Sequence, residues 1–214
     1  MNSSTQRSTI TGSAGAIECA IDLPASGTAR GVVVLCHPHP QHGGTLDNKV
    51  VQTLARAFVL LGYTSVRFNF RGIGASQGAW DEGRGEVDDA LAVVAAHRAA
   101  KNQAVQPLVL AGFSFGGYVA SQAALRLAAA GEGAERVVLV GPAVKSFEVA
   151  AVPADTLVIH GEMDDVVALA DVFAWARPQA LPVTVLPGAG HFFHGQLPVL
   201  KQIVVGAWAS RTAA

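Results

Sequence analysis

Six short runs of almost purely apolar residues are spread along the chain, and helical patterns rich in Ala, Leu and Val separate most of them. Such runs are typical of strands buried on both faces, so we predict strands at residues 31–36, 64–68, 107–112, 136–140, 155–160 and 183–186. The helical patterns predict helices at residues 46–61, 86–100, 117–130, 165–176 and 196–210. Near the start, residues 10–23 predict a hairpin that turns at residues 12–15. This alternation predicts an α/β fold, a mostly parallel eight-stranded sheet with helices on both faces.

The composition fits a single domain that spans residues 1–214 and buries a large core, because half of the residues are hydrophobic and only 14% are charged. The net charge is −1 and no run of Lys or Arg stands out, which argues against nucleic acid or a membrane surface as a partner. No apolar stretch is long enough to cross a bilayer, and the first seven residues lack the apolar segment of a signal peptide. Two cysteines, Cys19 and Cys36, cannot form a disulfide framework. We therefore expect a cytoplasmic protein, a monomer or a homodimer.

Polar and glycine-rich segments follow five of the predicted strands, at residues 37–44, 69–78, 112–117, 160–165 and 188–194. In open parallel sheets, ligands bind beyond the carboxyl ends of the strands. These segments are therefore expected to converge on one site, although they are far apart in the sequence.

The most informative of these segments reads Gly112-Phe113-Ser114-Phe115-Gly116 and lies between a buried strand and a helix rich in small residues. A Ser between two glycines at a strand-to-helix turn is the nucleophile elbow, where bulky flanking side chains do not fit. The turn lifts the Ser hydroxyl above the edge of the sheet, and the start of the helix offers N–H groups to developing negative charge. The pattern therefore indicates a nucleophilic Ser114.

Over nearly its whole length the sequence resembles the α/β-hydrolase superfamily. Within it, the chain is similar to small bacterial serine hydrolases related to dienelactone hydrolase and to the catalytic domains of prolyl-oligopeptidase-like enzymes. Five stretches in the same order carry this resemblance: His-Pro-His-Pro-Gln-His-Gly-Gly at 37–44, Phe-Asn-Phe-Arg-Gly-Ile-Gly-Ala-Ser at 68–76, Gly-Phe-Ser-Phe-Gly-Gly at 112–117, the segment 161–167, and Gly-His-Phe-Phe at 190–193.

The resemblance implies a Ser-His-Asp triad in which Ser114 is the nucleophile and His191 the base. Asp164 has the family's spacing before two apolar residues and is expected to be the acid. Asp165 and Glu162 are the alternatives, and Asp165 is expected instead to cap the helix that follows it.

The resemblance also implies an oxyanion hole built from the backbone N–H groups of Phe115 and His39. Pro38 and Pro40 carry no N–H group, so the available early donors of this loop are His37, His39 and Gln41. No cofactor and no metal are required. The cluster of His37, His39 and His42 could instead form a metal site. The prolines between these histidines disfavour this interpretation, because they limit how closely the rings can converge.

The connection at residues 141–154 is too short for a large lid, so we expect an open site that takes a small-molecule ester. Its apolar walls suit short-chain acyl esters, which makes the predicted enzyme carboxylesterase-like. Other interpretations are a peptidase or amidase, a dienelactone-type hydrolase, and a non-catalytic binding protein on a hydrolase scaffold. From loop positions alone, the residues expected to bind substrate are His42, Trp80, Phe113, Phe147 and Phe192.

Overall fold

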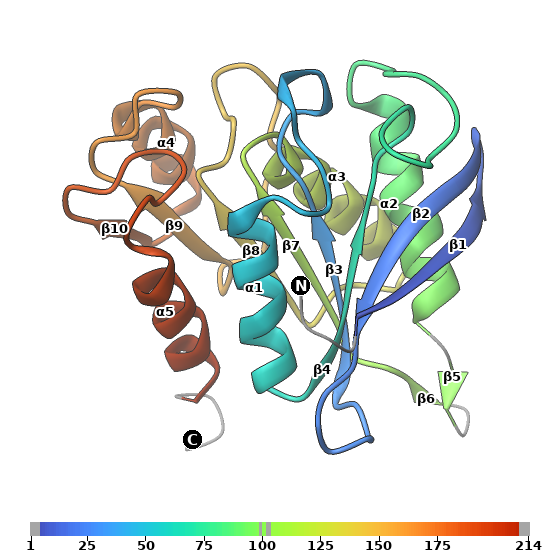
Figure 1. The fold of residues 1–214 in the computed structure, drawn as a ribbon. Coiled ribbons are helices and arrows are strands. Elements are labelled where there is room, and N and C mark those ends of the chain that lie inside the picture. Colours follow the sequence, from blue (N-terminus) through green and yellow to red (C-terminus); the bar gives the residue numbers. More distant parts are fainter. Residues whose placement is uncertain (1–4, 99, 102–103, 210–214) are drawn as a thin grey trace.

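An eight-stranded sheet runs through the centre of the computed structural model, which describes residues 5–98, 100–101 and 104–209 (Figure 1). The strand order is β1-β2-β4-β3-β7-β8-β9-β10. Only β1 and β2 run antiparallel to their neighbours, and the remaining pairs are parallel. This confirms the predicted α/β fold. The strands are β1 (Gln6–Gly12), β2 (Gly15–Asp22), β3 (Gly31–Cys36), β4 (Tyr63–Phe68), β7 (Leu108–Phe113), β8 (Arg136–Val140), β9 (Leu157–Gly161) and β10 (Val183–Leu186).

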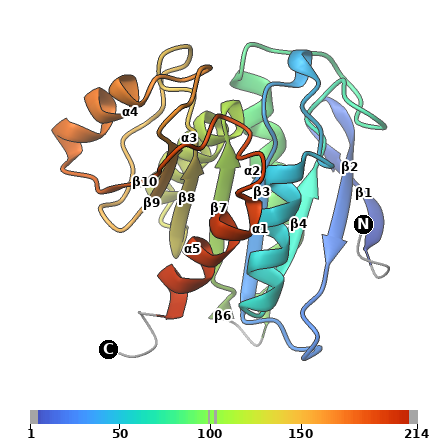
Figure 2. The ribbon, with the colours of Figure 1, turned by 60° about the vertical axis from the view of Figure 1, so that its left-hand side comes forward.

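Helices cover both faces of this sheet: α1 and α5 lie on one face, and α2 and α3 lie on the other (Figures 1 and 2). Because both faces are covered, all six residues of β3 and all six of β7 are buried. The helices are α1 (Lys49–Leu60), α2 (Arg84–His97), α3 (Phe115–Ala129), α4 (Leu169–Ala176) and α5 (Leu197–Ala209), with short 3₁₀ turns η1 (Pro40–His42) and η2 (Arg177–Gln179). A small separate hairpin pairs β5 (Ala100–Lys101) with β6 (Ala104–Val105).

The sequence explains both where helix α1 begins and which of its sides packs against the sheet. Asn48 precedes it, and the Asn48 amide oxygen accepts hydrogen bonds from the N–H groups of Val50 and Val51, 2.9 and 3.3 Å away. Val50, Leu54 and Phe58 recur at helical spacing and are buried against the sheet. The predicted start at residue 46 is therefore three residues early, because the cap at Asn48 decides where the helix begins.

Two other predicted helices differ from the structure by three or more residues at one end. The helix predicted at 86–100 ends at His97, and the chain then enters β5. The helix predicted at 165–176 begins only at Leu169, and its N-cap residue is Ala168. The prediction that Asp165 caps this helix is therefore wrong. Residue 210, which ends the last predicted helix, lies outside the described residues.

The connection between β8 and β9, residues 141–156, contains no helix and leaves the carboxyl ends of the central strands uncovered by any lid. None of the helices in the described part of the chain is long and apolar enough to cross a membrane.

Candidate functional site

Four of the loops at the carboxyl ends of the strands enclose a cavity of about 140 Å³. The loops after β3, β7, β9 and β10 each contribute to it, as expected for a parallel sheet. The cavity therefore brings together segments that are more than 150 residues apart in the sequence. Its lining consists of Pro38, His39, His42, Gly43, Gly44, Asn48, Ser114, Val166, His191 and Phe192.

Ser114 sits at the sharp turn between β7 and α3, with φ at 55°. This left-handed conformation is uncommon for a residue with a side chain, and it is typical of a functional turn held by its surroundings. A Cβ atom on Gly112 would collide with the backbone of Gly116, and one on Gly116 would collide with the backbone of Cys36. The two glycines are therefore required for α3 to start directly against the end of β3.

His191 and Asp164 are joined by a hydrogen bond of 2.7 Å between His191 Nδ1 and Asp164 Oδ2. The other carboxylate oxygen, Oδ1, accepts the N–H groups of Val166 and Val167 at 3.0 and 2.7 Å. Burial would raise the pKa of Asp164, but the hydrogen bonds from His191 and Val167 outweigh it and hold that pKa below its ordinary value. Asp164 is therefore an ionised carboxylate aimed at the imidazole.

The same turn explains why α4 begins late. Because Asp164 Oδ1 binds the N–H groups of Val166 and Val167, these residues form a tight turn instead of the first turn of a helix. Asp165 is left exposed, and the Glu162 carboxylate accepts the N–H of Gly188 at 2.8 Å. Of the three acidic residues considered from the sequence, the structure brings Asp164 to His191.

The ring of His191 is held by two phenylalanines. Phe113 is completely buried and packs against it with ring centroids 4.9 Å apart, and Phe192 packs edge-on at 5.1 Å. Phe192 is 46% exposed and lines the cavity, whereas Phe113, expected from the sequence in the cavity wall, lies beneath His191 in the core. Within the part of the chain that the structure describes, no hydrogen bond joins the Ser114 hydroxyl to His191, although both line the same cavity. Such contacts are often loose without substrate.

The loop after β3 is held rigidly at the other side of Ser114. His37 is buried: its Nδ1 donates to the carbonyl of Pro38 at 2.7 Å and its Nε2 accepts the N–H of Phe70 at 3.1 Å. The carbonyl of His39 accepts the N–H groups of His42 and Gly44 at 3.1 and 3.0 Å. These bonds, together with the two prolines, fix the course of the loop beside the elbow.

Two backbone N–H groups beside Ser114 are available to a ligand. In the described residues, neither the N–H of Phe115 nor that of His39 donates a hydrogen bond to another protein atom. The elbow and the loop are close together, since a Cβ atom on Gly116 would also contact the carbonyl of His37. Free donors of this kind beside a nucleophile suit the stabilisation of an oxyanion.

The remaining residues expected to bind substrate surround His39. The His39 ring stacks on His42 at 4.4 Å and packs against Trp80 at 4.6 Å and Phe147 at 5.8 Å. His42 lines the cavity, whereas Trp80 and Phe147 are not among the described residues that line it and pack against Phe115 instead. Asn48 also lines the cavity, although the sequence did not predict it as a site residue. Its position just before a helical pattern indicates a helix start at that point.

We expect the folded protein to lose stability as the pH falls from about 6.5 to about 4, because burial lowers the pKa of His37 from 6.5 to about 4. Between these pH values the imidazole is protonated in the unfolded chain but stays neutral in the folded protein. Lowering the pH therefore favours unfolding. The loss attributable to His37 is up to about 3 kcal/mol. Urea unfolding at several pH values measures it, and His37→Gln, whose amide oxygen keeps an acceptor for the N–H of Phe70, should flatten the dependence. An equal dependence in the variant would contradict this assignment.

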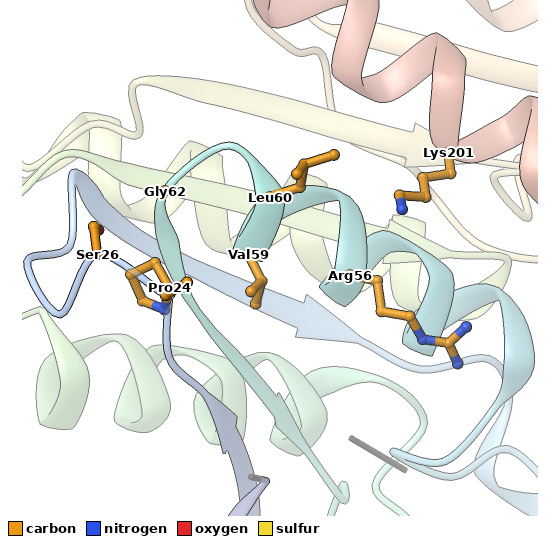
Figure 3. A pocket seen from close by; sticks show the side chains of 8 residues that line it. Pro24, Ser26, Arg56, Val59, Leu60, Gly62 and Lys201 are labelled. Carbon is orange, nitrogen blue, oxygen red and sulfur yellow. The ribbon is translucent and has the colours of Figure 1, made fainter. Parts of the chain in front are cut away.

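A larger hollow of about 420 Å³ lies away from these loops, between the connection after β2, the end of α1, and α5 (Figure 3). Lys201 and Arg56 lie near it, but its lining contains neither a histidine nor a carboxylate. It therefore lacks the pair of histidine and carboxylate that lies beside Ser114. The smaller cavity at Ser114 is therefore the candidate active site. The larger hollow is lined by Pro24, Ala25, Ser26, Arg56, Val59, Leu60, Gly62 and Lys201.

Comparison with known proteins agrees with this fold. The sequence profile of the serine aminopeptidase family (S33) matches residues 27–150. A lidless α/β serine hydrolase from Xanthomonas campestris is 35% identical, with 97% of this chain and 94% of that one covered and a TM-score of 0.85. An α/β serine hydrolase homologue from Coxiella burnetii is 37% identical, with 94% and 95% covered and a TM-score of 0.78. An uncharacterized protein of Rickettsia prowazekii is 32% identical over 175 residues, 76% of this chain and 71% of that protein.

The chain therefore belongs to the serine aminopeptidase family (S33) of the α/β-hydrolase superfamily. Its structure is similar to those of lidless α/β serine hydrolases over nearly its whole length.

Proposed function

We propose that the protein is a carboxylesterase-like serine hydrolase that cleaves small, short-chain acyl esters. The observation that carries the proposal is the cavity lined by both Ser114, at a strained elbow, and His191, itself bound to Asp164 at 2.7 Å. A hydroxyl needs a base to become nucleophilic, and the base needs an anion to orient it. These three residues supply the three roles.

In the proposed reaction, the Ser114 oxygen attacks the ester carbonyl carbon while His191 Nε2 takes the hydroxyl proton. The N–H groups of Phe115 and His39 bind the oxyanion of the tetrahedral intermediate. The intermediate expels the alcohol, which leaves with the proton from His191. A water molecule, deprotonated by the same ring, then attacks the acyl-enzyme, and the acid departs as Ser114 regains its proton. Asp164 stabilises the imidazolium in both steps.

The family's name makes an aminopeptidase the second candidate. An aminopeptidase must hold the positively charged amino group of its substrate, which calls for a carboxylate in the binding cavity. Of the described residues that line this cavity, none is Asp or Glu. The lining supplies histidine rings, an asparagine amide and apolar side chains instead, which favours an uncharged acyl group.

The cavity size predicts a preference for short acyl chains. Its volume of about 140 Å³ is close to that of a cavity that holds benzene. This leaves room for the reacting ester group together with an acyl chain of about two to four carbons. A longer chain must extend over the exposed side chains of Val166 and Phe192. We expect kcat/KM for p-nitrophenyl acetate or butyrate to exceed that for the octanoate by about tenfold or more.

The matched controls in this assay are the p-nitroanilides of butyrate and of alanine, which replace the ester with an amide. Turnover of the alanine anilide faster than that of the esters would favour the aminopeptidase. Equal kcat/KM across all acyl lengths would contradict the proposed fit of the acyl group in the cavity.

A further inference from the structure

His160 lies at the carboxyl end of β9, four residues before Asp164, and is completely buried. Its Nε2 is 2.9 Å from the carbonyl oxygen of Val167 and 3.5 Å from Asp164 Oδ2. Its other ring nitrogen, Nδ1, is also buried and has no hydrogen-bond partner among the described residues. The proposed triad therefore has a second imidazole behind its carboxylate.

The contacts determine the protonation of this ring. A carbonyl oxygen can only accept, so Nε2 must carry the hydrogen. Burial lowers the pKa of His160, which leaves the ring neutral with a bare lone pair on Nδ1. An unpaired polar atom in a protein core is unfavourable, and an apolar side chain would avoid it. The residue at this position is nevertheless a histidine, whose one N–H faces the Val167 carbonyl and the Asp164 carboxylate.

We propose that His160 is a positioning residue that holds Asp164 in the orientation required by His191, an inference that rests on the proposed function. By binding the Val167 carbonyl, His160 closes the turn whose N–H groups bind Asp164 Oδ1. This leaves Oδ2 directed at His191, with the His160 N–H beside it. In metal sites, residues that orient a ligand change activity by about 10- to 100-fold when they are removed, and we expect an effect of similar size here.

Two amide variants test the role of the Nε2 donor. In His160→Gln the amide nitrogen can occupy the place of Nε2, whereas in His160→Asn the donor is too short to reach Val167. We expect kcat for p-nitrophenyl acetate to remain within about threefold of wild type in His160→Gln and to fall about 10- to 100-fold in His160→Asn, with KM changed less than about twofold. Ile159→Ala, on the opposite face of the same strand, is the control for lost stability.

A second readout does not depend on turnover: the proton NMR signal of the His191 Nδ1–H in its bond to Asp164. We expect this signal in wild type and His160→Gln, and its loss or broadening in His160→Asn. An unchanged signal in all variants, or an equal fall of kcat in a comparably destabilised Ile159→Ala, would overturn the inference. If no ester is turned over and yet the signal responds as described, the proposed function fails while the positioning role stands.

Discussion

Replacement of Ser114 by alanine is expected to reduce kcat for p-nitrophenyl acetate by about 10⁴-fold or more. The variant keeps the cavity, the His191–Asp164 pair and the free N–H groups of Phe115 and His39, but it has no oxygen to form the acyl-enzyme. Only the weak background catalysis of the remaining site is left. Because Ser114 is 8% exposed and its hydroxyl makes no hydrogen bond within the described residues, folding should be unaffected.

Intact-mass measurement after treatment with a fluorophosphonate probe gives the same test without a substrate. Wild type should gain one adduct, and Ser114→Ala should gain none. Ser146→Ala, which removes an exposed serine in the β8–β9 connection, is the matched control and should be labelled like wild type. A folded wild type that gains no adduct would support the interpretation as a non-catalytic binding protein.

The second large effect is expected from Asp164→Asn, with kcat reduced by about 10⁴-fold near neutral pH. The amide can still accept the N–H groups of Val166 and Val167, so the turn should survive. Its NH₂ group then faces His191 and selects the tautomer whose Nε2 carries the hydrogen, which cannot accept the Ser114 proton. The measurement is kcat together with the thermal unfolding midpoint, which should change little.

Asp165→Asn and Glu162→Gln are the controls for this prediction, since these residues were the other acids considered from the sequence. Asp165 is exposed beside the turn, and Glu162 binds the N–H of Gly188. Both variants should keep kcat within about twofold of wild type, as is usual for surface changes away from the chemistry. A loss in either variant as large as that in Asp164→Asn would show that the acid has been misassigned.

The sequence predicted those strands and turns that depend on the residue pattern within the segment itself. The apolar runs predicted the six parallel strands of the main sheet, because a strand buried on both faces must be apolar at nearly every position, and the hairpin pattern predicted β1 and β2. The elbow at Ser114 could also be predicted from the sequence, because two glycines are required where α3 meets the end of β3. The start of α4 was misplaced by four residues, since the hydrogen bonds of Asp164 override the helical pattern there.

The sequence by itself thus determined the layered sheet, the turn that presents Ser114, and the polar loops at the strand ends, since each follows from residue pattern and backbone sterics. Only the tertiary structure decided which acid meets His191, that Phe113 lies under that ring, and that His160 lies behind Asp164. These contacts join residues from different strands and loops. Their geometry depends on how the strands are ordered and how the loops pack, which no local pattern encodes.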